Sequence, residues 1–216
     1  MTTPADLRAR VVADYTAVQP LPSPPVRAVW VAPFALLALF AAPAYFNVRA
    51  DAPQLGWLAT WGVSMLQVGL GFVLIVAALR ESIPGRGWTG PQLLLWIASP
   101  VAAVVAVTFA SASLSAIPLG RHAWWQVSVV CLTGSAAMAL PIVAMANVLA
   151  AGAYPTRPGV AGTLLGLGAG VMADAGWRIF CHFGEPSHVL SAHLGGVAIA
   201  TAAGAALALT LRRPFR

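Results

Sequence analysis

Six long apolar runs follow one another along this chain and constrain its fold more than any other feature. A helix needs roughly 20 mostly apolar residues to cross the hydrocarbon core of a bilayer, and each run has about that length. Every connection between them is short, so no soluble domain is inserted. The runs cover residues 28–47, 57–79, 91–110, 124–149, 159–181 and 189–211. The sequence therefore predicts an all-α protein, a six-helix transmembrane bundle over residues 28–216 with a tail over residues 1–27.

The composition supports a membrane protein. Apolar residues make up 59% of the chain and charged residues only 8%, whereas soluble domains carry roughly 25% charged residues. The net charge of +6 is the difference between twelve scattered arginines and six acidic residues. They form no basic stripe interleaved with aromatic residues, so the expected surroundings are a lipid bilayer and direct nucleic-acid binding is not expected.

The arginines predict the orientation, because cytoplasmic loops of membrane proteins carry an excess of Lys and Arg. With the tail in the cytoplasm, nine arginines lie inside and three outside. The inside set is Arg8, Arg10, Arg27, Arg80, Arg86, Arg157, Arg212, Arg213 and Arg216, and the outside set is Arg49, Arg121 and Arg178. We expect both termini to be cytoplasmic.

The tail has two parts. Residues 5–17 predict a short helix, in which Leu7, Val11 and Tyr15 recur every four residues and form one apolar stripe. The proline-rich stretch 19–25 cannot be helical and should extend. Because so short a helix is not stable alone in water, it needs a partner or the membrane surface.

Small residues mark the fifth run. Gly162, Gly166 and Gly170 recur every four residues and share one helix face, which lets helix backbones approach closely. Tight packing within the bundle is the expected use of this face, and a homo-oligomer interface is the alternative.

Polar groups concentrate at the outer ends of the fifth and sixth runs. Asp174 and Arg178 are four residues apart with the acid first, which predicts a structural ion pair within one helix. A proton relay is the alternative use of this pair.

The two cysteines, Cys131 and Cys181, both fall in the outer half of the membrane. A disulfide is permitted on that side. His182, His188 and His193 lie close in sequence to Cys181, and thiolate with imidazole suits zinc or copper. The spacing matches no tight zinc motif, so a disulfide, a metal bound by Cys131, Cys181 and His182, and reduced thiols all stay open.

Enzyme motifs are missing from the sequence. There is no nucleophile elbow, P-loop or His-Glu-x-x-His motif, and no cofactor is expected. Two other functions remain alternatives to a signalling protein. One is a small transporter or channel that uses the polar groups of the fifth and sixth runs, and the other is a cofactor-binding membrane redox subunit.

Several segments resemble the NrsF-type family of bacterial multi-pass membrane anti-sigma factors. The order and spacing of the segments carry the resemblance, since no single motif is diagnostic. The similar segments are Val-Gln-Pro-Leu-Pro-Ser-Pro-Pro at 18–25, Ala-Leu-Arg-Glu-Ser-Ile-Pro-Gly-Arg at 78–86, Ala-Gly-Val-Met-Ala-Asp-Ala-Gly-Trp-Arg-Ile-Phe-Cys-His at 169–182 and His-Val-Leu-Ser-Ala-His at 188–193.

The resemblance implies a function. Such proteins hold an extracytoplasmic-function sigma factor at the bacterial inner membrane and release it on an external signal. In this chain the holding segment would be the tail, with contacts that we infer from its helical stripe: Leu7, Val11 and Tyr15, flanked by Arg8 and Arg10. Cys131 and Cys181 match cysteine positions in the family and would sense the signal. A tail of 27 residues cannot fold alone, so ordering it on binding would cost about 2–5 kcal/mol.

Overall fold

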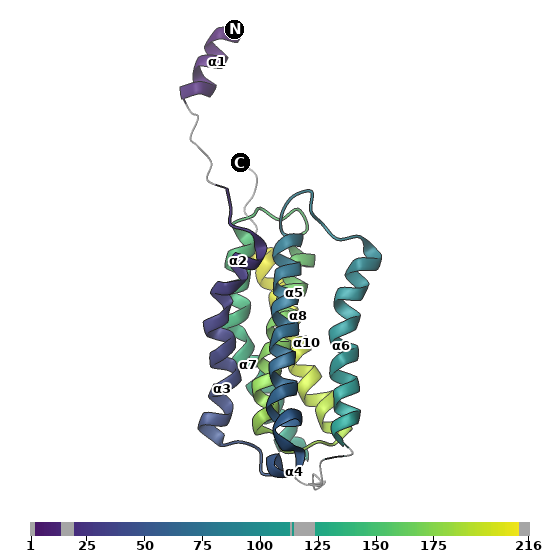
Figure 1. Cartoon of the computed structure of the whole chain (residues 1–216). Coiled ribbons are helices and arrows are strands. Elements are labelled where there is room, and N and C mark those ends of the chain that lie inside the picture. Colours follow the sequence, from purple (N-terminus) through teal and green to yellow (C-terminus); the bar gives the residue numbers. More distant parts are fainter. Residues whose placement is uncertain (1–2, 14–19, 113, 115–123, 212–216) are drawn as a thin grey trace.

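The computed structural model describes residues 3–13, 20–112, 114 and 124–211, and the regular elements in these ranges are all helices. Six of the helical segments are long and apolar enough to cross a membrane, which confirms the predicted fold class (Figure 1). Their bounds are Pro24–Phe46, Ala52–Glu81, Gly90–Ala110, Trp124–Ala151, Pro158–Phe180 and Pro186–Leu211.

Three of the spans change helix type along their length. The first comprises α2 (Pro24–Ala28), a 3₁₀ turn (Val29–Val31) and α3 (Ala32–Phe46); the second comprises α4 (Ala52–Trp57), the π-helical η2 (Leu58–Gly62) and α5 (Val63–Glu81); the sixth comprises α9 (Pro186–His188), the π-helical η3 (Val189–His193) and α10 (Leu194–Leu211). The remaining spans are α6 (Gly90–Ala112), α7 (Trp124–Ala151) and α8 (Pro158–Phe180).

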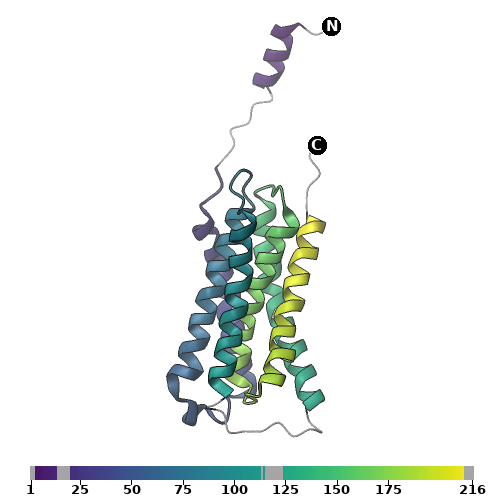
Figure 2. The same ribbon diagram turned by 90° about the vertical axis from the view of Figure 1, so that its right-hand side faces the viewer.

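Helix α8 is the centre of the bundle. In its apolar window 83% of the residues are buried, compared with at most 50% in the other five spans. The helices α3, α5, α7 and α10 all pack against α8, whereas α6 lies at the edge (Figures 1 and 2). A side chain on α8 therefore has protein neighbours on every side, even where it is polar.

Glycines make this close packing possible. Gly162, Gly166 and Gly170 face the backbone of α10, where an added Cβ would overlap residues such as Ala200 and Gly204. The predicted glycine face is therefore used within one chain. Because α10 covers it, the alternative of a homo-oligomer through this face does not agree with the structure.

Replacing Gly166 with alanine is expected to lower the stability of the bundle. The new methyl group would overlap the carbonyl oxygen of Ala200, which is backbone and cannot rotate away, so we expect a cost of about 1–3 kcal/mol from overpacking. Gly159→Ala on the same helix is the control, because its nearest neighbour would be Leu209 Cδ2 at an ordinary 3.7 Å. Thermal unfolding in detergent measures both variants, and equal midpoints would contradict the packing argument.

The tail helix α1 (Pro4–Ala13) stands apart from the bundle (Figure 1). It starts with a reciprocal cap: the Thr3 hydroxyl donates to Asp6 at 2.6 Å, and the Asp6 N–H donates back to Thr3 Oγ1 at 3.3 Å. The hydrogen bonds from Thr3 lower the pKa of Asp6, so the cap keeps its charge at neutral pH. Pro4 occupies the first helical position, where its missing N–H costs nothing.

Candidate functional site

The two cysteines meet at the end of the bundle away from the tail. Cys131 lies on α7 and Cys181 directly follows α8, and their sulfur atoms are 3.7 Å apart. Both side chains are buried and both thiols are free. Although 50 residues separate them in sequence, the structure places them at one site.

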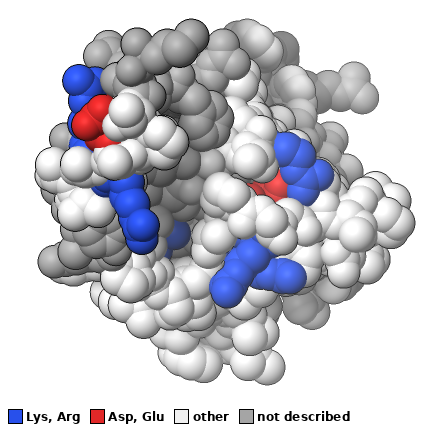
Figure 3. Space-filling model, turned by 90° about the horizontal axis from the view of Figure 1, so that it is seen from above, with Lys and Arg blue, Asp and Glu red and all other residues white. Residues whose placement is uncertain are grey.

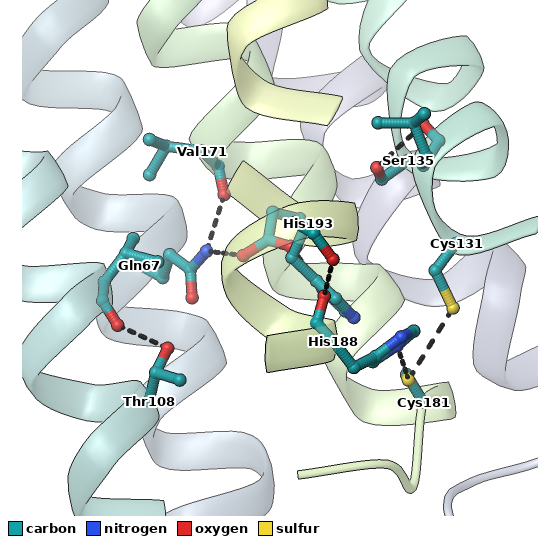
Figure 4. Close-up of polar contacts among 12 residues, drawn as sticks. Gln67, Thr108, Cys131, Ser135, Val171, Cys181, His188 and His193 are labelled. Carbon is teal, nitrogen blue, oxygen red and sulfur yellow. Dashed lines mark hydrogen bonds and ion pairs between the residues drawn. The ribbon is translucent and has the colours of Figure 1, made fainter. Parts of the chain in front are cut away.

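Two of the three candidate histidines join the cysteines, and they are not the predicted ligand set. The group that can share one ion consists of Cys131, Cys181, His188 and His193, whose ligand atoms all lie within 4.8 Å of one another. His188 Nε2 is 3.4 Å from the sulfur of Cys181 (Figure 4). His182 lies outside this group and its ring packs against Phe183.

The π-helical turn η3 explains why His188 and His193 face the same way. In a regular α-helix, residues five apart point about 140° away from each other. A π-helix closes i→i+5 hydrogen bonds, so residues five apart lie nearly one above the other. The two imidazole rings accordingly lie 5.4 Å apart. The local helix type, which the sequence analysis did not predict, brings both rings to the site.

Hydrogen bonds fix the orientation of both rings through their Nδ1 atoms. Ser128 Oγ is 3.0 Å from His188 Nδ1, and Asp174 Oδ1 is 2.6 Å from His193 Nδ1. Gln67 on α5 donates from Nε2 to Asp174 Oδ2 at 2.6 Å and to the Val171 carbonyl at 3.1 Å (Figure 4). The sequence analysis missed Ser128 and Gln67, whose only signal is that they are polar residues inside apolar runs.

Asp174 pairs with His193 and not with Arg178. Both carboxylate oxygens are occupied, one by His193 and the other by Gln67. Arg178 is one helical turn away, and its Nη1 atom is buried without a hydrogen-bond partner. The predicted pair within α8 is therefore replaced by contacts from the neighbouring helices, because α5 and the sixth span bring polar side chains directly to the carboxylate.

A pocket of about 220 Å³ leads to the cysteines. Its wall is almost entirely apolar and includes Cys131 and Cys181 together with Gln126, Val127, Val130, Phe180, His182 and Phe183. Burial lowers the pKa of His182, so this imidazole is neutral at pH 7. The two cysteines therefore border a cavity that is large enough for a small molecule or ion.

Helices α7 and α3 extend from the cluster of cysteines and histidines to the end of the bundle that carries the tail. Helix α7 holds Cys131, and near its far end the carbonyl of Leu149 accepts a hydrogen bond from the Arg27 side chain at the start of the first span. Helix α3 continues from that start, and Phe46 at its end contacts Trp177 edge-to-face and lies tilted against Phe180, beside the cysteines. The first span thus contacts the cluster at one end and carries the tail at the other.

The tail end of the bundle has a loop held by polar contacts and a basic surface. Arg157 forms an ion pair with Glu81 at 2.7 Å and donates to the Trp88 carbonyl at 2.9 Å, while Arg80 lies 3.8 Å from the centre of the Trp88 ring. Figure 3 views this end and shows arginine side chains with few acidic ones.

The predicted stripe of the tail is exposed where it is described. Leu7 is 60% and Val11 61% exposed, and Arg8 and Arg10 beside them are also exposed. Tyr15 lies outside the described residues. Two adjacent apolar side chains on a helix in water offer a surface that a partner can cover.

Comparison with known proteins gives one match. No curated protein and no solved structure matches the chain. The model of the NrsF family, described as negative regulator of sigma F, matches residues 11–213, nearly the whole chain. That description names a regulator and not a class of enzyme. The chain, a membrane protein with six spanning helices, therefore belongs to the NrsF family of negative regulators of sigma F.

Proposed function

We propose that this protein is a membrane-bound anti-sigma factor that sequesters an extracytoplasmic-function sigma factor and releases it on an extracytoplasmic redox or metal signal. The observation that carries the proposal is the match of a sigma-regulator family to residues 11–213 of a six-span chain. It favours a regulator over the transporter and redox-subunit alternatives, because neither of them requires a sigma factor as a partner.

The proposed location is the bacterial inner membrane, with both termini in the cytoplasm where the sigma factor is. Nine arginines on the tail side against three on the other side support this orientation. It places the cluster of Cys131, Cys181, His188 and His193 at the extracytoplasmic end, where it meets external signals first.

The tail helix α1 is the proposed holding segment. Its exposed Leu7 and Val11 suit the helix-in-groove mode, in which an amphipathic helix places its apolar face in a groove of the partner. Arg8 and Arg10 add positive charge beside the stripe. In this proposal the sigma factor supplies an apolar groove with acidic residues at its rim.

Release is proposed to follow a change of helix packing at the cysteines. A shift of α7 would move the Leu149 carbonyl, to which the Arg27 side chain is hydrogen-bonded. A shift of the aromatic group around Trp177 would displace Phe46, which contacts Trp177 at the end of α3. Both routes lead to the start of the first span, from which the tail emerges. The two bundle states then differ in how the tail is presented.

Affinity purification of the full-length protein in detergent tests the proposal. We expect a sigma factor to co-purify from the native cytosol, and to be lost when residues 1–25 are deleted. A sigma-dependent reporter should be repressed by the full chain and not by the truncated chain. If no sigma factor is recovered and the reporter does not respond to either chain, the proposal is wrong.

A further inference from the structure

We infer that Cys131, Cys181, His188 and His193 form a tetrahedral binding site for a thiophilic divalent cation, of which Zn²⁺ is the example that fits best. The four side chains come from α7, from the loop after α8, from α9 (His188) and from the π-helical η3 (His193). Their exposed fractions are between 0% and 4%, so they turn toward one another and away from lipid and water.

Two of the distances within the group match the edges of a tetrahedral zinc site. With Zn–S near 2.3 Å and Zn–N near 2.0–2.1 Å, tetrahedral angles separate two sulfurs by about 3.8 Å and a sulfur from a nitrogen by about 3.6 Å. The observed separations are 3.7 Å between the two sulfurs and 3.4 Å between Cys181 Sγ and His188 Nε2. The other ligand atoms lie within 4.8 Å of one another, so an ion at the centre of the group would draw some of its ligands inward.

Both histidines have the supporting contacts that metal ligands carry. A ligating imidazole donates its other ring N–H to a fixed acceptor, which sets the tautomer and the direction of the free nitrogen. Ser128 at His188 Nδ1 and Asp174 at His193 Nδ1 occupy these positions. Nε2 of His193 is buried without a hydrogen-bond partner. A buried nitrogen without a partner is costly, and a bound ion would satisfy it.

The charge of the cluster favours a divalent ion. Cysteines bind metals as thiolates and histidines as neutral imidazoles, so the four ligands together carry two negative charges. A divalent cation neutralises them, whereas a monovalent ion would leave one net negative charge in a site from which water is excluded. Buried net charge is strongly unfavourable, so a divalent ion fits the charge of these four ligands.

Cys131 and Cys181 also line the pocket described above, so the site borders a cavity. Binding would draw α7, the end of α8 and the start of the sixth span together at one point. The role of this ion as the signal that releases the sigma factor rests on the proposed function. Binding itself does not, because it needs this chain alone.

Metal content of the purified full-length protein tests the site. The protein is prepared in detergent under reducing, anaerobic conditions, loaded with Zn²⁺ and freed of excess ion. We expect one Zn²⁺ per chain, and Co²⁺ in its place should give the visible absorption of a tetrahedral thiolate site. A chain that holds no Zn²⁺, or that captures Cu⁺ but not Zn²⁺, overturns the divalent assignment.

Variants test the ligand set. C131S, C181S, H188Q and H193Q should each lose the stoichiometric ion, whereas H182A, which changes a pocket residue outside the group, should keep it. D174N should keep the ion but weaken its affinity about 10–100-fold, as loss of a supporting carboxylate does.

Gel filtration and circular dichroism confirm that each variant is folded. Equal Zn²⁺ affinity in all folded variants overturns the site. A sigma-dependent reporter is measured separately. If the ion binds but does not change the output of the reporter, the result counts against the proposed function and not against the site.

Discussion

Replacing both Leu7 and Val11 with aspartate is expected to abolish binding of the sigma factor. Each side chain is more than half exposed in the free protein, and burying a Leu or Val side chain in a partner groove contributes about 1.5–3 kcal/mol. Loss of both contributions weakens the complex at least about 100-fold. Placing two carboxylates in an apolar groove adds a desolvation cost. The measurement is the amount of sigma factor that co-purifies with the full-length chain.

Ala9→Asp is the matched control for this prediction. It introduces the same charge into the same helix, but Ala9 lies on the face opposite the Leu7–Val11 stripe. The control should keep binding within a fewfold of the unmodified protein. If it loses the sigma factor as completely as the double variant, negative charge on the tail is responsible and the stripe is not the contact.

Replacing Cys131 or Cys181 with serine is expected to hold the sigma factor in its bound state. Moving a two-state equilibrium from 1:99 to 99:1 requires a signal that favours one state about 10⁴-fold. Serine removes the thiol chemistry that provides this preference, while it keeps nearly the same volume in a buried site. A sigma-dependent reporter should therefore stay at its uninduced level under the stimulus that induces the unmodified strain.

Thr133→Val is the control on the same helix. Thr133 is exposed and its hydroxyl bonds only to backbone of its own helix, so normal induction is expected. Each cysteine variant must also still repress the reporter and reach the membrane in normal amount, which separates a silent sensor from an unfolded protein. Full induction in both cysteine variants would contradict the proposed role of the thiols.

The transmembrane architecture could be predicted from the sequence because it depends on local properties. Six apolar helices are predicted, and the structure has six helices that are long and apolar enough to cross a membrane. Bilayer thickness fixes the length of an apolar helix, whatever its neighbours are. The glycine spacing likewise predicts a face for close packing. It does not indicate which surface fills that face, and the structure places α10 there.

The cluster could be predicted only in part. The sequence singled out both cysteines and three histidines as candidates, and the metal set that it left open combined His182 with the two cysteines. The path of the chain after Cys181 and the π-helical turn η3 determine which histidines lie near the two sulfur atoms. They place His188 and His193 there, and not His182. Ser128 and Gln67 enter from α7 and α5, which no spacing within a single helix indicates.

The sequence by itself determined what each segment requires: six apolar helices need a bilayer, and a short helical tail needs a partner or the membrane surface. Only the tertiary structure decided which polar groups satisfy one another. A buried carboxylate or imidazole must find a hydrogen-bond partner among the side chains that packing brings near it. For Asp174 those partners are His193 and Gln67 from the helices packed against α8, and not Arg178 on its own helix. Hydropathy is a property of each segment by itself, whereas hydrogen-bond partners are set by contacts between helices that are distant in sequence.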